Sequence, residues 1–79
     1  MAIYISIKKT DEQDTHADNA FGLDGRSLGV LRISKSSGDV VLLKETEGDA
    51  DLRIYSCAAY KIKKYWANEE YPAITCWAS

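Results

Sequence analysis

Three side chains near the N-terminus have the types and spacing of metal ligands. Asp14, His16 and Asp18 alternate along the chain, so an extended backbone would bring two carboxylates and one imidazole to the same side. The stretch departs from a calcium-binding EF-hand loop, because its sixth position is Asn19 and its twelfth is Gly25. A solvated acidic loop with a lone histidine is the simpler interpretation. We therefore expect neither a metal nor another cofactor.

Catalysis would require a nucleophile or general base held against a partner group. His16 is the sole histidine, but it lies among acidic residues in a stretch with no large apolar anchor. Cys57 and Cys76 are too far apart for a CxxC pair, so reduced, buried thiols are expected. The adjacent Glu69 and Glu70 are expected to be solvated. The sequence thus predicts a protein that is not an enzyme.

Two patterns are compatible with phosphate groups as ligands. Gly22, Gly25 and Gly29 lie close together, but no P-loop lysine and no helix-opening GxGxxG accompanies them. Residues 60–66 interleave aromatic and basic side chains, as surfaces for single-stranded nucleic acid do. The formal net charge of −2 disfavours nucleic acid as a partner, and lysines near the end of a helix also complement its dipole.

The elements that hold these residues are predicted from hydrophobic periodicity. Ile3, Ile5 and Ile7 alternate with polar residues, which is typical of a half-buried strand. The stretch 10–19 contains four acidic residues and no large apolar one, so it is expected to be a loop.

Two further strands are expected over 27–34 and 40–46, joined by the polar link 35–39 into an antiparallel hairpin. A terminal strand is expected over 73–79. Helical spacing connects five apolar residues, after two aspartates that can cap the helix: Leu52, Tyr55, Ala59, Ile62 and Trp66.

These elements predict one α+β domain over 1–79 in the order β-β-β-α-β. Its four-stranded sheet would be mostly antiparallel or mixed, with the helix packed on one face. A chain of 79 residues has room for a single hydrophobic core and buries only about 60% of its unfolded surface. Association with another chain would add to its stability.

Both faces of the predicted sheet carry apolar residues, although one helix covers only one face. Val41 and Leu43 alternate with Val40 and Leu42, and Tyr4 and Trp77 are expected to join the uncovered side. The sequence therefore predicts a binding or assembly module that forms a homodimer through this face, with four interface candidates: Tyr4, Val41, Leu43 and Trp77.

A second interpretation is an immunity or antitoxin-like protein whose acidic surface binds a basic protein partner. A small enzyme or metal-binding protein is a third. The N-terminus lacks the apolar run of a secretory signal, and no run approaches the roughly 20 apolar residues of a membrane span, so a cytoplasmic protein is expected.

Overall fold

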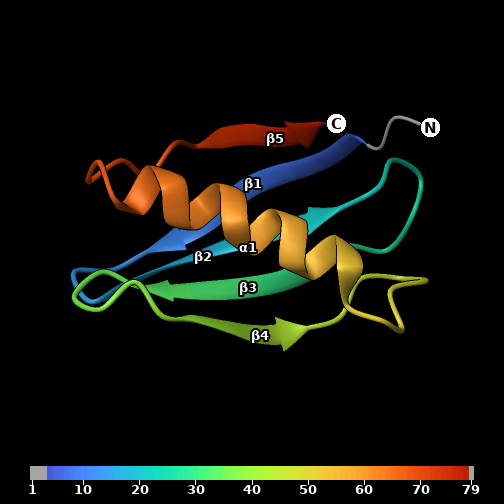
Figure 1. The fold of residues 1–79 in the computed structure, drawn as a ribbon, viewed down its shortest axis with the longest axis horizontal. Helices are drawn as coiled ribbons and strands as arrows, with labels where there is room; N and C mark the ends of the chain where they lie inside the picture. The colour runs from blue at the N-terminus through green and yellow to red at the C-terminus, as the bar shows by residue number, and fades with distance from the viewer. Residues whose placement is uncertain (1–3, 79) are drawn as a thin grey trace.

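The computed structural model describes residues 4–78, so Ile3 of the expected first strand lies outside the described residues. The fold is a five-stranded antiparallel sheet with one helix, in the α+β class that the sequence predicted (Figure 1). The strand order across the sheet is β4-β3-β2-β1-β5. The elements follow the chain as β1 (Tyr4–Glu12), β2 (His16–Gly22), β3 (Gly29–Ser34), β4 (Val40–Lys44), α1 (Arg53–Trp66) and β5 (Ile74–Ala78).

The prediction of a loop over 10–19 is wrong. This stretch instead contributes to β1 and β2, and β2 is the fifth strand that the sequence did not predict. Most of the stretch belongs to the β1–β2 hairpin, which turns at residues 13–15. Its carboxylates are compatible with a sheet because cations reach them from elsewhere: Arg32 on β3 pairs with Asp18, and Lys35 after β3 pairs with Glu12. Ala17 also places a small apolar side chain in the core.

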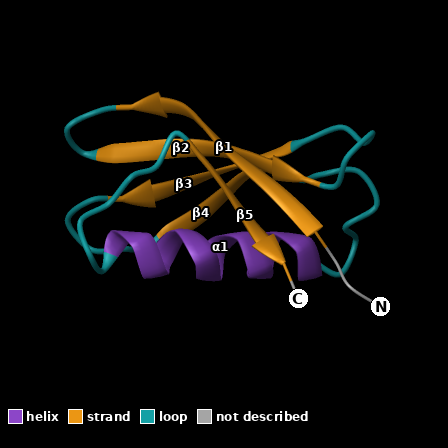
Figure 2. Ribbon diagram, turned by 90° about the horizontal axis from the view of Figure 1, so that it is seen from above, coloured by secondary structure: helices purple, strands orange, loops and turns teal. Residues whose placement is uncertain are grey.

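The helix covers one face of the sheet and leaves the other face open (Figure 2). The buried core lies between these two layers and consists of Ile5, Ile7, Ala17, Phe21, Leu31, Ile33, Ala58 and Ile62. In residues 4–78 no helix has both the length and the apolar character needed to cross a membrane.

The N-cap position of α1 is Leu52 and not one of the two expected aspartates, but both aspartates accept hydrogen bonds from its first turn. The Asp49 carboxylate accepts hydrogen bonds from the backbone N–H groups of Ile54 and Tyr55, both at 2.9 Å. Asp51 accepts one from the N–H of Arg53 at 3.2 Å. These bonds satisfy amides that a helix leaves without internal partners, and they fix where the helix begins over the sheet.

Candidate functional site

The candidate site is the sheet face opposite α1, called the open face below. Directly paired residues of neighbouring antiparallel strands point to the same side of a sheet, so the strand register arranges the open face in rows. The first row crosses four strands through Asp11, Asp18, Arg32 and Val41. The second row lies two residues away on β2 and β3, and three residues away on β1 and β4, where the register shifts. It crosses all five strands through Ile74, Lys8, Ala20, Val30 and Lys44.

The two rows differ in charge. The first row holds two carboxylates and one guanidinium, a formal net charge of −1, while the second row holds two lysines, a formal charge of +2. Lys8 and Lys44 are both exposed. The open face is therefore electrostatically polarised along the direction of the strands.

Exposed hydrophobic side chains are concentrated on this side of the molecule. Within residues 4–78, four large ones belong to the open face and a fifth, Leu28, borders it beside Ser6 and Ala20. A sixth, Tyr60, lies on α1. The four on the open face are Tyr4, Val41, Leu43 and Ile74, with exposed fractions from 48% to 74%.

The structure brings together only part of the predicted interface set. Val41 and Leu43 are neighbours on β4, whereas Tyr4 lies on β1, with two strands between them. The placement of Trp77 on the open face is wrong. Trp77 pairs with the buried Ile5 and packs against the core beneath α1. The reason is the register of β5 on β1, which turns Thr75 and Trp77 to the helix side of the sheet.

Ile74 is the open-face residue that the sequence reasoning missed. It occupies the other phase of β5 and is 74% exposed, paired with Lys8. Strand β5 carries large apolar residues in both phases, since Ile74 and Trp77 are an odd number of positions apart. Alternation alone therefore gave no signal for choosing between them.

The predicted metal-ligand trio is also rearranged. The carboxylates of Asp11 and Asp18 and the His16 ring offer ligand atoms within 4.8 Å of one another, while Asp14 is exposed in the hairpin turn. A register shift between Lys9 and Asp11 sets Asp11 opposite Asp18. The structure thus replaces Asp14 by Asp11 in this cluster.

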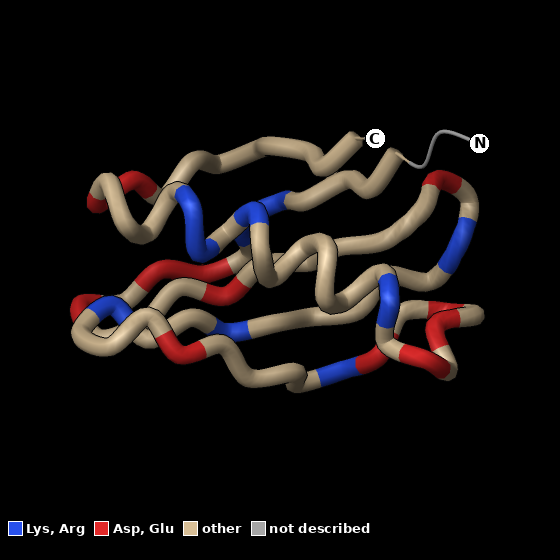
Figure 3. The backbone as a smooth tube through the Cα atoms, in the orientation of Figure 1, with Lys and Arg blue, Asp and Glu red and all other residues tan. Residues whose placement is uncertain are grey.

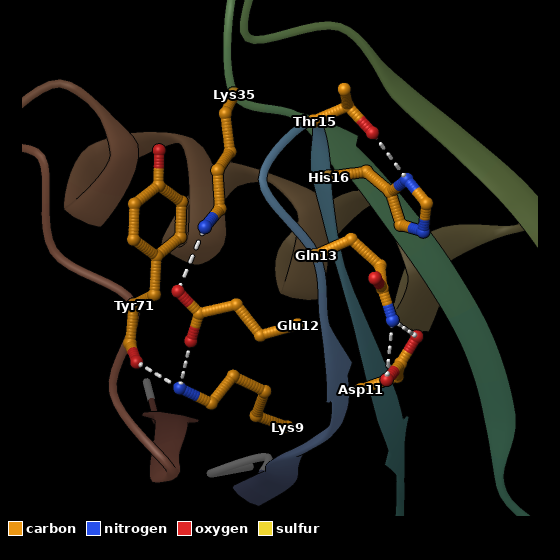
Figure 4. Close-up of polar contacts among 8 residues, drawn as sticks. All are labelled: Lys9, Asp11, Glu12, Gln13, Thr15, His16, Lys35 and Tyr71. Atoms are coloured by element: carbon orange, nitrogen blue, oxygen red, sulfur yellow. Dashed lines mark hydrogen bonds and ion pairs between the residues drawn. The ribbon is translucent and has the colours of Figure 1, made fainter.

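Each side chain of the cluster already has a hydrogen-bond partner. Arg32 donates to both oxygens of Asp18, with Nε–Oδ1 at 2.7 Å and Nη2–Oδ2 at 3.1 Å. These bonds hold the pKa of Asp18 below its usual range. Gln13 Nε2 donates to Asp11, and the Thr15 hydroxyl lies 3.1 Å from His16 Nδ1 (Figure 4). The guanidinium thus supplies the positive charge beside Asp18.

A second polar network occupies the other side of the same hairpin (Figure 4). Lys35 Nζ lies 2.8 Å from Glu12 Oε2, and Lys9 pairs with the other oxygen of Glu12. These two ammonium groups lower the pKa of Glu12 to about 2, with the Lys35 hydrogen bond as the largest cause. Lys9 also donates to the carbonyl of Tyr71 at 2.9 Å. The network joins the hairpin to the segments that follow β3 and α1.

The residues considered for catalysis lie in separate places. Cys57 is on α1 and Cys76 on β5, both as half-buried free thiols. Cys76 pairs with Ser6, which pairs with Gly22 at the opposite end of β2 from His16. Cys76 therefore lies at the far end of the sheet from His16, and Cys57 lies on the helix, so neither thiol belongs to the His16 cluster.

The basic helix face lies on the side away from the open face, and Figure 3 shows its lysine and arginine segments in front of the sheet. Two of its aromatic rings are covered by lysines of the same helix. Lys61 Nζ lies 5.5 Å from the ring centre of Tyr65, and Lys64 Nζ lies 5.4 Å from that of Tyr60. These contacts use ring surface that nucleic-acid bases would need for stacking.

No protein-family model, curated protein or solved structure matches this chain.

Proposed function

We propose that the protein is a non-catalytic interaction module that self-associates through the open face. The observation that carries this proposal is that four exposed large apolar residues, Tyr4, Val41, Leu43 and Ile74, lie on the side that α1 leaves uncovered, two at the β4 edge and two on β1 and β5. Scattered surface hydrophobes need no explanation, but several on one sheet face are typical of a binding surface. An isologous contact through this face would cover apolar area of both copies with one interface.

The face is better suited to association than the sheet edges are. The edge strands β4 and β5 each contain five residues, and β4 has a register shift opposite Val30 and Leu31. Short strands, bulges and lysines are features that prevent edge-to-edge pairing. Self-association by simple extension of the sheet is therefore disfavoured relative to packing face to face.

The two free thiols, Cys57 and Cys76, suit a reducing compartment. We accordingly place the proposed homodimer in the cytoplasm.

Sedimentation velocity at micromolar concentrations tests self-association. The wild-type chain is expected to sediment as a dimer and Leu43→Glu as a monomer, because the substitution puts a charge among apolar contacts. Tyr60→Glu is the matched control, since Tyr60 is also about half exposed but lies on α1. It should remain dimeric. A wild-type chain that stays monomeric up to about 100 µM, far above the Kd range of stable dimers, would reject the proposal.

A monomer would favour the second candidate, a module that binds a basic protein through acidic residues. The β4–α1 connection supplies the exposed Glu45, Glu47 and Asp51, seen as the red segments beside β4 and the start of α1 in Figure 3. Part of this charge has an internal role, because Glu47 accepts a hydrogen bond from the N–H of Ser27 and Asp51 caps α1.

A further inference from the structure

We propose that the partner on the open face is a second copy with its strands reversed end to end, so that the first row of each copy faces the second row of the other. This inference rests on the proposed self-association. The required two-fold axis lies between the two sheets, perpendicular to the strands, and passes between the rows. Each strand then lies over its own copy, with its direction reversed.

Charge complementarity is the first support for this arrangement. The first row has a formal charge of −1 and the second row +2, so the reversed orientation sets rows of opposite sign against each other twice. On β1 it brings Asp11 over Lys8 of the other copy. An axis parallel to the strands would instead set Lys8 over Val30 and Lys44 over Ile74, so neither lysine would lie opposite a carboxylate of the other copy.

The apolar residues of β4 give the second support. Val41 and Leu43 lie two positions apart, on either side of the proposed axis level. Val41 is in the first row and Lys44 in the second, so reversal of β4 over its own copy puts Val41 over Lys44 of the other chain, with Leu43 at the bulge beside it. With the axis parallel to the strands, β4 would lie over β5, since these strands form opposite edges of the sheet. The reversed arrangement thus keeps the exposed aliphatic side chains of β4 beside those of the other copy.

The ion pair in the first row is compatible with burial in this interface. Asp18 and Arg32 neutralise each other through two hydrogen bonds, and they would face the small apolar Ala20 and Val30 of the other copy. A compensated, hydrogen-bonded pair costs far less to desolvate than a lone charge.

The size of the face also fits a second copy. The molecule extends 34 × 22 Å along its two longer axes, and the sheet lies roughly in this plane in Figure 1. This outline of the whole molecule, loops included, covers about 750 Å² in projection, which is of the same order as the roughly 800 Å² per partner of a standard interface. One further copy is therefore enough to cover it.

Charge reversal on β1 tests the orientation. Lys8→Glu alone and Asp11→Lys alone each create two like-charge contacts in the reversed dimer, so each is expected to raise the dimer Kd by about tenfold or more. An equimolar mixture of the two variants should recover wild-type affinity, because both contacts then join opposite charges. Lys63→Glu, an equal change of charge on α1, should leave the dimer unchanged. Sedimentation and circular dichroism would report association and folding.

The outcomes separate the orientation from self-association itself. A wild-type monomer overturns both proposals. A wild-type dimer that Leu43→Glu disrupts, but whose Lys8→Glu and Asp11→Lys variants either stay dimeric or fail to recover on mixing, overturns only the reversed orientation. Recovery in the mixture, with both single variants folded but monomeric, supports it.

Discussion

Arg32 and Asp18 face each other across β3 and β2 and are joined by two hydrogen bonds, with Nε–Oδ1 at 2.7 Å and Nη2–Oδ2 at 3.1 Å. Asp18 is only 9% exposed. A carboxylate this buried is tolerated in a sheet when its charge is compensated and hydrogen-bonded. The pair therefore explains how the acidic Asp18 is accommodated in the central strand β2.

Removing only the cation is expected to destabilise the fold. Arg32→Met leaves the Asp18 carboxylate buried without its partner, so the midpoint of urea unfolding should fall clearly. The double variant Asp18→Asn/Arg32→Met should recover part of that loss, because an amide costs less to bury than a charge. If the losses in free energy of unfolding of Arg32→Met and Asp18→Asn simply add up in the double variant, the two side chains are not energetically coupled and the prediction is wrong.

Divalent metal ions are expected to leave the melting temperature unchanged. Both Asp18 oxygens accept bonds from Arg32, and Asp11 accepts from Gln13, so an ion must displace existing partners. Differential scanning fluorimetry with zinc or manganese, and with a chelator as control, measures this. A rise that saturates with metal concentration would show binding to the folded state and would contradict the prediction.

The helix contact should account for a large share of stability. Ile62 is 4% exposed in the core, so Ile62→Ala is expected to lower the free energy of unfolding by about 2–4 kcal/mol through lost burial and a residual cavity. Lys63→Ala, one position along on the exposed side, should cost under about 0.5 kcal/mol. Equal effects in chemical denaturation would contradict the observed orientation of α1.

The β1–β2 hairpin should tolerate change at its turn but not along its strands. Replacing residues 10–19 by a short Gly-Ser link removes most of β2's contacts with β3, including the buried Ala17, and is expected to abolish cooperative unfolding. Inserting three Gly or Ser residues after the exposed Asp14 only lengthens a turn, so it should cost about 1 kcal/mol or less. Near-native melting of the 10–19 replacement would contradict the hairpin.

Acid should weaken the Glu12 network. The pKa of Glu12 is lowered from 4.5 to about 2, chiefly by Lys35 and then Lys9. A lowered pKa in the folded state means that the stabilisation is fully present above pH 4.5 and is lost as the pH falls toward 2. The difference in melting temperature between the wild type and Glu12→Gln should narrow across that interval. Glu70→Gln, an exposed control, should show no such narrowing, and a constant Glu12 difference would contradict the prediction.

The sequence by itself determined the elements whose signals are local. Apolar residues at helical spacing, with aspartates before them, predicted α1 and the carboxylates that bind its first amides, because contacts three and four residues apart decide a helix face. The polar link 35–39 likewise predicted the antiparallel pairing of β3 and β4. The α+β class follows from this helix and this antiparallel strand pair.

Only the tertiary structure decided what depends on partners distant in the sequence. The stretch containing Asp11 and Asp18 lacks apolar alternation, and its strand character depends on Arg32 and Lys35, which are contributed by a later part of the chain. The exchange of Asp14 for Asp11 beside His16 follows from a register shift in β1. Neither the distant cations nor the register shift can be predicted from the spacing of the acidic residues.

The face to which each residue of β5 belongs was decided in the same way. Ile74 and Trp77 make both phases of this strand apolar, so period-two alternation fits either orientation. Pairing of Trp77 with the buried Ile5, and of Ile74 with Lys8, places the indole under α1 and the isoleucine on the open face. The physical reason is that a strand's face is set by its register on the neighbouring strand, and a shift of one residue would reverse it.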